Sequence, residues 1–593
     1  MKAHRAALRP RRHPLGLVAL AAAATIGFDG ARFALAAPGI VGTPEVCAGD
    51  CGSNKLVTVD EIITLLNVAL GQLEITACPY GVPNSAGVDV SVIVQAVSNA
   101  LTSGCSAARR CEALRGMTTG GARIISANLT RATPSYPEHC KVRGRIAPQL
   151  NFEVRLPTTW SGRALFIGGG GLNGFIPAPE TVMFNPSIAQ AGYVTIASDS
   201  GHQASFLDGS WALDDPPAVE NFAYLATHTV LSAARGIVSA RYGREVAHTY
   251  FIGASQGGRE ALIAAQRWPA DFDGLIALEP VYDITALTLA LNRVAQRVFI
   301  APGARLSLEK VSTLANAVLD ACDDLDGLAD GIIGNVAACQ FDPVRLRCAG
   351  EDSDGCLTDA QIETVNTIHG EMVLDFALAN DVQSYPGWPT GHESVAFSGG
   401  WPLWIVGASA DPSSSQGFVL SDQTLRFLVA NDADLETLPF DANAYESELV
   451  AFSTLADATD ADLSAFAARD GKLILWHGLA DYAVSPRSTV RYYDQVVSTL
   501  GGQEAADDFI RFYTSPGVDH LNFGPGAGTI DFLGALTAWV ETGMPPGDLI
   551  AAKTDLSSSA PLFTRPLCRY PHYPRYDGSG DPASASSFQC VPP

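Results

Sequence analysis

Short apolar segments with a strand pattern alternate with amphipathic helical segments along most of the chain. Residues 164–167 form a fully apolar run, and residues 222–242 show the apolar repeat of a helix. Strands that alternate with helices in this way predict an α/β fold with a mostly parallel sheet, here built from residues 110–285 and 470–593. Residues 286–469 are richer in loops and aromatic side chains, and we expect them to form a large lid insertion over the sheet.

Two further segments precede the predicted sheet. Residues 1–36 have basic side chains, then an apolar run, then the small-residue stretch Ala34-Leu-Ala36, which is the pattern of a signal peptide. The apolar run is shorter than the roughly 20 residues that span a bilayer, so we expect no membrane anchor. Residues 45–106 contain two apolar helical patterns, at 59–70 and 88–101, and we expect a small helical module there.

Charge and cysteine content indicate where such a protein works. The formal net charge of -24 argues against nucleic acid or an anionic membrane as a partner, because both are themselves negative. The 12 cysteines form an even number and bracket loops, which favours an oxidising compartment. Together with the signal pattern, these features predict a secreted or periplasmic protein.

The run Gly253-Ala-Ser255-Gln-Gly257 has the context of a nucleophile elbow. A β-rich segment precedes it and an uninterrupted helical pattern follows it. A serine hydroxyl becomes reactive when a sharp turn exposes it beside a general base, and glycines on both sides permit the strained backbone. The elbow predicts an α/β-hydrolase with Ser255 as the nucleophile, and a purely structural turn is the alternative.

An acid and a base follow the serine in the order that this fold requires. Asp481 lies in a glycine-containing turn after the apolar strand pattern at 472–476, and His520 lies in a glycine-rich loop after the strand pattern at 509–513. His520 would take the proton from the serine, and Asp481 would fix the imidazole tautomer. The nearest alternatives are His477 and Asp519. Asp519 is adjacent to His520 in sequence, from where a carboxylate rarely reaches the imidazole.

Backbone N–H groups must also stabilise the negative charge that develops on the substrate oxygen. One is expected from Gln256, which follows the nucleophile. The other is expected from Gly170 or Gly171, in a glycine run after the strand pattern at 164–167, because glycine lets a backbone approach a substrate closely. The run lacks the spacing of a nucleotide-binding loop.

Several motifs together resemble the tannase and feruloyl esterase family over about residues 110–593. Arg259-Glu-Ala-Leu follows the elbow, Ser198-Asp-Ser-Gly-His202 precedes it, and Gly-Pro-Gly526 ends the histidine loop. The resemblance implies a carboxylic ester hydrolase acting on feruloyl, galloyl or terephthaloyl esters through an acyl-enzyme, with no cofactor needed for the chemistry. One departure concerns two positions that carry disulfide-bonded cysteines in the family, which here hold Ala254 and Leu521.

The same resemblance implies a structural calcium ion and four disulfides. The acidic loop from Cys322 to Gly334 alternates oxygen ligands with glycines, as a hard cation requires. Carried over from the family, the calcium ligands are Asp323, Asp326, Leu328, Asp330 and Ile332. The implied disulfides are Cys111 with Cys140, Cys322 with Cys339, Cys348 with Cys356, and Cys568 with Cys590.

The module at residues 45–106 looks like a dockerin, which implies a protein partner. Asp50 and Glu61 have the spacing of first and last ligands in a calcium loop, but Gly52 and Lys55 replace an expected ligand and glycine. A pair of helices held by Cys47, Cys51, Cys78 and Cys105 without calcium is an equal alternative. For the whole chain, the alternatives are a non-aromatic carboxylesterase and a surface or complex binding protein that uses this module.

Overall fold

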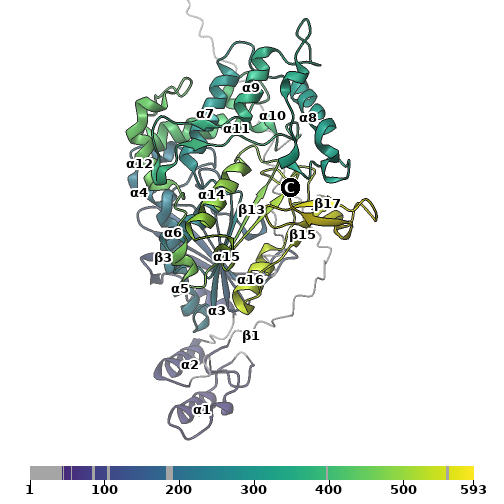
Figure 1. The fold of residues 1–593 in the computed structure, drawn as a ribbon. Helices are drawn as coiled ribbons and strands as arrows, with labels where there is room; N and C mark the ends of the chain where they lie inside the picture. The colour runs from purple at the N-terminus through teal and green to yellow at the C-terminus, as the bar shows by residue number, and fades with distance from the viewer. Residues whose placement is uncertain are drawn as a thin grey trace, which may run out of the picture.

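The computed structural model describes residues 43–44, 46–54, 56–82, 87–102, 107–181, 191–395, 399–555 and 560–593. The predicted signal peptide, residues 1–36, lies outside these ranges. Figure 1 shows three parts: a small helical pair at one end, a central sheet with helices around it, and a helical layer at the opposite end.

A ten-stranded sheet forms the centre of the molecule, in the order β14-β13-β10-β9-β7-β8-β5-β4-β3-β2. The strands from β14 to β8 in this order pair in parallel, whereas those from β8 to β2 pair antiparallel. The strands are β2 (Thr118–Thr119), β3 (Ala122–Thr130), β4 (His139–Ile146), β5 (Leu150–Pro157), β7 (Arg163–Ile167), β8 (Val194–Ser198), β9 (His248–Ala254), β10 (Gly274–Leu278), β13 (Lys472–Gly478) and β14 (Ile510–Ser515). The α/β-hydrolase prediction therefore holds, with an antiparallel extension at one edge.

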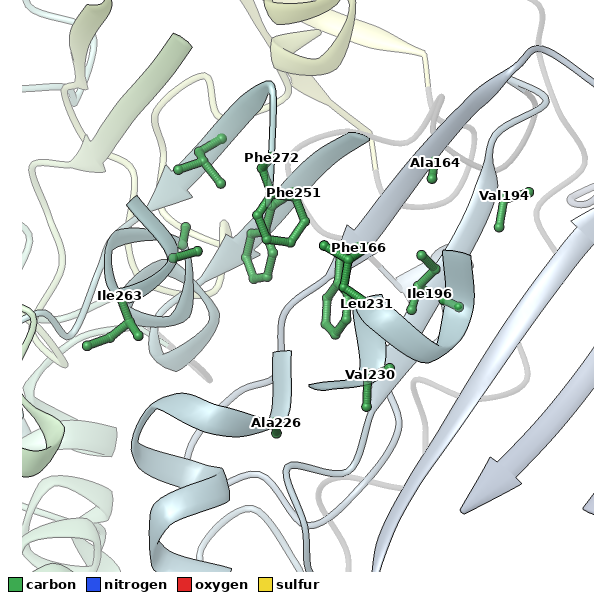
Figure 2. Close-up of a cluster of buried hydrophobic side chains, with 14 of the residues drawn as sticks. Ala164, Phe166, Val194, Ile196, Ala226, Val230, Leu231, Phe251, Ile263 and Phe272 are labelled. Carbon is green, nitrogen blue, oxygen red and sulfur yellow. The ribbon is translucent and has the colours of Figure 1, made fainter. Parts of the chain in front are cut away.

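Both faces of the parallel half are buried, which explains why its strands are apolar along their whole length. One face packs on α5 (Ala226–Tyr242), α6 (Gln256–Arg267) and α14 (Pro486–Thr499), and the other packs on α16 (Phe532–Thr542). Figure 2 shows the first interface, where Phe166 stacks on Phe251 with centroids 5.5 Å apart and Phe272 meets both rings edge-on. This core fixes the strand register, and with it the positions of the loops at the strand ends.

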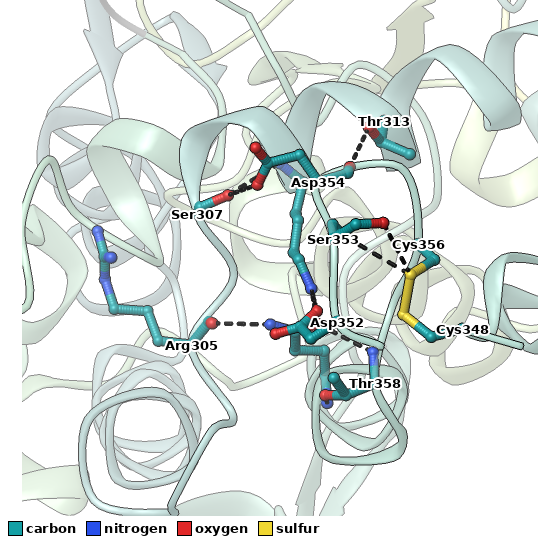
Figure 3. A network of polar contacts seen from close by, with 11 residues as sticks. Arg305, Ser307, Thr313, Cys348, Asp352, Ser353, Asp354, Cys356 and Thr358 are labelled. Atoms are coloured by element: carbon teal, nitrogen blue, oxygen red, sulfur yellow. Dashed lines mark hydrogen bonds and ion pairs between the residues drawn. A yellow bond between two sulfur atoms is a disulfide. The ribbon is translucent and has the colours of Figure 1, made fainter. Parts of the chain in front are cut away.

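The segment between β10 and β13 forms a separate helical layer with its own apolar core. Its main helices are α7 (Ile284–Phe299), α8 (Leu308–Cys322), α9 (Asp359–His369), α10 (Trp401–Trp404), α11 (Gln416–Gln423) and α12 (Glu446–Ala456). The disulfides Cys322–Cys339 and Cys348–Cys356 cross-link it. Figure 3 shows how the second of these loops is tied to α8, with Thr313 donating to the carbonyl of Asp354.

The remaining two expected disulfides, Cys111–Cys140 and Cys568–Cys590, are also formed. The second joins β16 to β18 in a pair of C-terminal hairpins, which lie beside the helical layer (Figure 1). The four hairpin strands are β15 (Leu549–Thr554), β16 (Pro561–Leu567), β17 (Tyr573–Tyr576) and β18 (Phe588–Val591).

The N-terminal module contains α1 (Val59–Ala69) and α2 (Val90–Thr102) around a small core, with the disulfide Cys51–Cys78. Glu61 accepts hydrogen bonds from the N–H groups of Gly52 and Thr58, so this carboxylate caps α1 and closes the loop that begins at Asp50. Across the ranges given above, no helix is long and apolar enough to cross a bilayer.

Replacing Phe166 with alanine tests the role of this core. Phe166 is buried between the sheet and α5, so Phe166→Ala should lower the free energy of unfolding by about 3–5 kcal/mol. Ile125→Ala on β3 is the matched control, because Ile125 is 55% exposed and should change that free energy by less than about 0.5 kcal/mol. Urea unfolding followed by circular dichroism measures both, and equal effects would contradict this description of the core.

Candidate active site

Ser255 lies on a strained turn between β9 and α6. Its backbone has φ 59 and ψ -119, a conformation that non-glycine residues seldom adopt. The flanking glycines are required by close contact, since a Cβ on Gly253 would lie 2.4 Å from the carbonyl carbon of Gly257. This geometry is that of a nucleophile elbow at the carboxyl end of β9.

Asp481 and His520 meet at the same edge of the sheet, on the loops after β13 and β14. His520 Nδ1 donates a hydrogen bond to Asp481 Oδ2 at 2.7 Å. Asp481 Oδ1 accepts from the N–H groups of Ala483 and Val484 at 2.8 and 2.9 Å, which fixes the carboxylate within its own turn. The bond at Nδ1 leaves Nε2 as the nitrogen that can take a proton from a nucleophile.

The two alternatives from the sequence have different positions. Asp519 accepts hydrogen bonds from the N–H groups of Leu521 and Phe523, so it shapes the histidine loop and makes no bond to the imidazole of His520 among the described residues. His477 is fully buried and bonds Asp481 Oδ2 through Nε2 at 3.1 Å. His477 is therefore a neighbour of the acid, a role that the sequence analysis did not assign to it.

The surroundings of Asp481 favour its charged form. Burial alone raises the pKa of this carboxyl, but the attraction to His520 and the hydrogen bonds from His477 and His520 outweigh burial and lower the pKa to about 2. Asp481 is thus ionised across the working range of any ordinary enzyme and can stabilise a positive charge on His520.

The glycine run expected to hold an oxyanion lies against the elbow. Gly257 donates its N–H to the carbonyl of Gly169 at 3.1 Å. Gly171 has φ 56, and a Cβ there would lie 2.4 Å from the carbonyl oxygen of Phe206, so no other residue fits. Within the described ranges the N–H groups of Gln256, Gly170 and Gly171 make no hydrogen bond, which leaves them available to a substrate oxygen.

Two motifs quoted for the family resemblance hold this glycine run in place. Glu260, on α6, is buried and accepts hydrogen bonds from Gly169 N–H at 3.2 Å and from Asn173 Nδ2 at 2.6 Å. His202 donates from Nε2 to the carbonyl of Leu172 at 2.9 Å, and burial lowers its pKa to about 4, so the ring is neutral at pH 7. Both side chains act on the backbone of the run and explain why these motifs accompany the elbow.

The helical layer contributes an aromatic ring to the site. Trp404 of α10 meets His520 edge-to-face, with ring centroids 5.5 Å apart. Tyr385, Trp388 and Trp401 of the same layer are buried in its core, as is Trp404 itself. The segment at 286–469 thus reaches the histidine, as expected of a lid. At the positions of the family's disulfide, Ala254 packs against the core beneath the sheet and Leu521 packs against the core of the layer.

The acidic loop expected to bind calcium lies beside the C-terminal hairpins and the end of β14. Asp326 Oδ1 accepts from Leu328 N–H, Asp330 Oδ1 accepts from Ile332 N–H, and Asp330 Oδ2 pairs with Arg565 at 2.6 Å. Burial, followed by the nearby charges of Asp330 and Asp323, raises the pKa of Asp326 to about 7. The three carboxylates do not all lie within 4.8 Å of one another, yet the charges of Asp330 and Asp323 raise the pKa of Asp326, and the charge of Asp330 raises that of Asp323.

Comparison with known proteins assigns most of the sheet and the helical layer to one family. Residues 134–591 match the family model described as tannase and feruloyl esterase. The chain belongs to the tannase and feruloyl esterase family. It is therefore a carboxylic ester hydrolase, as the elbow and the motifs around it predict.

Curated relatives in this family include bacterial and fungal proteins. An uncharacterised esterase of Agrobacterium fabrum is 33% identical over 90% of this chain and 100% of its own length. The mono(2-hydroxyethyl) terephthalate hydrolase of Piscinibacter sakaiensis is 31% identical over 79% of this chain and 87% of its own. A probable feruloyl esterase of Arthroderma benhamiae is 32% identical over 79% and 86%.

Solved structures of the family have the same fold. Feruloyl esterase B from Aspergillus oryzae superposes with a TM-score of 0.71 at 25% identity, over 82% of this chain and all of that chain. An esterase from the same organism gives a TM-score of 0.73 at 24% identity, with the same coverage. These comparisons match the α/β-hydrolase fold derived above.

One residue of this site was not predicted from the sequence. Glu279 directly follows β10, is fully buried, and places Oε2 3.5 Å from His520 Nδ1. The available signal was a lone carboxylate at the end of the fully apolar strand pattern 274–278, one position before a proline. Its partners are more than 200 positions away in sequence, so the spacing gave no reason to connect them.

Removing the Ser255 hydroxyl tests the assignment of the nucleophile. Ser255→Ala should lower turnover of an aryl ester by on the order of 10⁴-fold or more, because the attacking atom is lost while the fold stays intact. Ser232→Ala, at an exposed position on α5, is the control and should keep full turnover. Steady-state kinetics on the purified proteins decides, and normal turnover in Ser255→Ala would exclude this serine.

Proposed function

We propose that this esterase is secreted and hydrolyses esters of aromatic carboxylic acids of the feruloyl, galloyl or terephthaloyl type through an acyl-enzyme. The observation that carries the proposal is the 2.7 Å hydrogen bond between His520 and Asp481, at the sheet edge where the elbow presents Ser255. Secretion is supported by the signal pattern at residues 1–36 and by the five disulfides between described cysteines.

The reaction follows from the positions of these groups. Ser255 Oγ attacks the ester carbonyl carbon while His520 Nε2 takes its proton, and Asp481 stabilises the resulting imidazolium. The N–H groups of Gln256 and of Gly170 or Gly171 donate to the oxyanion. His520 gives its proton to the leaving alcohol. Water then attacks the acyl-enzyme while His520 takes a proton from it, and the acid leaves as Ser255 regains its proton from His520.

An aromatic acyl group is supported by the relatives and by the lid. The names of the terephthalate hydrolase and the feruloyl esterase described above refer to esters of aromatic acids. In this chain, the ring of Trp404 lies edge-to-face against the base His520, so it borders the place where an acyl group would bind, and an aromatic pair gains more than its buried area alone provides.

A panel of esters tests this specificity. The value of kcat/KM for ferulate, gallate and terephthalate esters should exceed that for an acetate ester of the same alcohol. Trp404→Leu should reduce the preference for aromatic acids about tenfold, because one aromatic contact is lost, and should leave the acetate ester nearly unaffected. Equal losses on both kinds of ester would show that Trp404 supports the fold of the lid without setting specificity, and a preference for acetate would favour the non-aromatic alternative.

The proposal includes a structural calcium ion in the lid. Its ligands would be the carboxylates of Asp323, Asp326 and Asp330 and the carbonyls of Leu328 and Ile332, all of which lie in one loop after α8. Support comes from the mutual repulsion of these carboxylates, of which Arg565 offsets part. The ion would stabilise the loop and takes no part in the chemistry at Ser255.

Calcium removal should destabilise the protein in a pH-dependent way. Without the ion, folded Asp326 keeps its proton up to about pH 7, whereas the unfolded chain releases it near about pH 4. Stability of the calcium-free protein should therefore fall as pH rises from about 4 to 7, and calcium should abolish this fall. Melting curves with chelator and with added calcium measure the effect.

Two variants in the same loop control this experiment. Asp326→Asn should remove the sensitivity to chelator, while Asp324→Asn, at an exposed position without a side-chain bond among the described residues, should keep it. Deletion of residues 1–106 excludes a contribution from Asp50 and Glu61 of the module. Melting temperatures that do not change with chelator, together with no calcium in elemental analysis, would refute the proposed calcium site.

The N-terminal module is proposed to contact a protein partner. Both helices expose an apolar stripe with the same spacing, formed by Val59, Ile63, Leu66 and Leu70 on α1 and by Val90, Val94, Val97 and Leu101 on α2. Such repeated exposed stripes are a mark of interaction surfaces. A function in binding alone is disfavoured by the intact serine, histidine and aspartate in the body of the protein.

A further inference from the structure

Glu279 occupies an unusual backbone position next to the reactive groups. It follows β10 with φ 45, in the left-handed region that residues other than glycine seldom adopt. Its N–H donates to the carbonyl of Trp476 in β13, and the residue before it, Leu278, accepts the N–H of Ser255. The strained residue is therefore held by the strands on both sides and by the elbow itself.

The side chain of Glu279 is fully buried and points at the histidine. Oε2 lies 3.5 Å from His520 Nδ1, the atom that also bonds Asp481 Oδ2 at 2.7 Å. Space for the carboxyl exists because residue 478 is glycine, where a Cβ would lie 2.9 Å from Glu279 Oε1. Neither oxygen of Glu279 has a hydrogen-bond partner among the described residues. Two carboxyl groups from neighbouring strands thus converge on one imidazole nitrogen.

The charges around Glu279 oppose its ionisation. Burial, then the negative charges of Asp481 and Asp519, raise its pKa well above the ordinary value, and only the nearby N–H of Gly478 acts in the opposite direction. The titratable groups that face it are Asp481 and His477 from the β13 side and Asp519 and His520 from the β14 side. A neutral acid at this place adds no second negative charge next to Asp481 and still offers a carbonyl oxygen to Nδ1.

We propose that Glu279 is a second orienting carboxyl for His520. The Glu279 carboxyl stays neutral while Asp481 carries the charge, and it becomes the ionised partner of His520 Nδ1 when Asp481 is neutralised. The inference rests on the proposed function, because it assigns Glu279 as a positioning residue that acts through His520. In an Asp481→Asn protein the amide tends to stabilise the wrong imidazole tautomer. A Glu279 carboxylate would accept the Nδ1 proton and restore the tautomer that attack by Ser255 requires.

The experiment compares Asp481→Asn with the double variant Asp481→Asn/Glu279→Gln over a range of pH. Removal of the only orienting carboxylate costs about 10⁴-fold in kcat. For Asp481→Asn we expect this loss to shrink toward about 10²-fold as pH rises and Glu279 ionises, with KM unchanged. The double variant should show the full loss at every pH, because glutamine has the shape of the neutral acid but cannot ionise.

The matched control replaces Asp519, the other carboxyl of this region whose pKa is raised. Asp481→Asn/Asp519→Asn should keep the gain in activity with rising pH, displaced to lower pH because the charge of Asp519 raises the pKa of Glu279, since Asp519 bonds its own loop and not His520. Equal activity of Asp481→Asn and the Glu279 double variant at every pH would overturn the inference, and so would an equal loss in the Asp519 control. Full turnover in Ser255→Ala would instead refute the proposed function itself, so the two failures are distinguishable.

A spectroscopic measurement keeps the inference testable should the double variant fail to fold. The difference between the infrared spectra of the unchanged protein and of Glu279→Gln at neutral pH should contain the C=O band of one protonated carboxylic acid, because buried carboxyls such as Asp283 contribute equally to both spectra. In Asp481→Asn the same band should titrate away as pH rises. Absence of the band from the difference spectrum would overturn the assignment of Glu279 as a neutral acid.

Discussion

The parallel pairing of β9, β10, β13 and β14 brings four reactive side chains to one edge of the sheet. Ser255, Glu279, Asp481 and His520 each follow the carboxyl end of one of these strands. Because a shift of one residue moves a strand by about 3.3 Å and reverses its faces, the registers must be fixed for a 2.7 Å bond to form between loops. The apolar cores on both faces fix them, so packing far from the serine determines its chemistry.

Carboxyl groups are concentrated at this edge, and they differ in their hydrogen-bond donors and in their burial. Asp481 has four hydrogen-bond donors and stays ionised, whereas Glu279 has none within the described part of the chain and is held neutral by burial and by its neighbours. Glu260 accepts a hydrogen bond from the N–H of Gly169 in the glycine run. Only Asp481 therefore directs a full negative charge at His520, which is what a transient imidazolium needs.

Local sequence was sufficient for the features that depend on local backbone. The elbow around Ser255 was predictable because glycine spacing reports the turn directly, whereas the calcium site expected in the acidic loop at Asp326 stays a prediction. The Asp481 and His520 loops followed from chain order. Glu279 was not predictable, since its role comes from a contact across strands. The antiparallel strands β2 to β5 were also missed, because a mostly parallel sheet leaves no sequence signal for the direction of its outer strands.

The helical layer connects the Trp404 ring beside His520 to the C-terminal hairpins. Trp404 is carried by α10, which packs against α8, and α8 leads directly into the acidic loop of Asp323–Asp326. That loop is held in turn by the C-terminal hairpins, through the pair of Arg565 with Asp330. The position of the ring beside His520 therefore depends in part on contacts made by the C-terminal hairpins. Any change that loosens the acidic loop, including loss of a bound cation, should alter the aromatic surface before it alters the strand ends that carry Ser255 and Asp481.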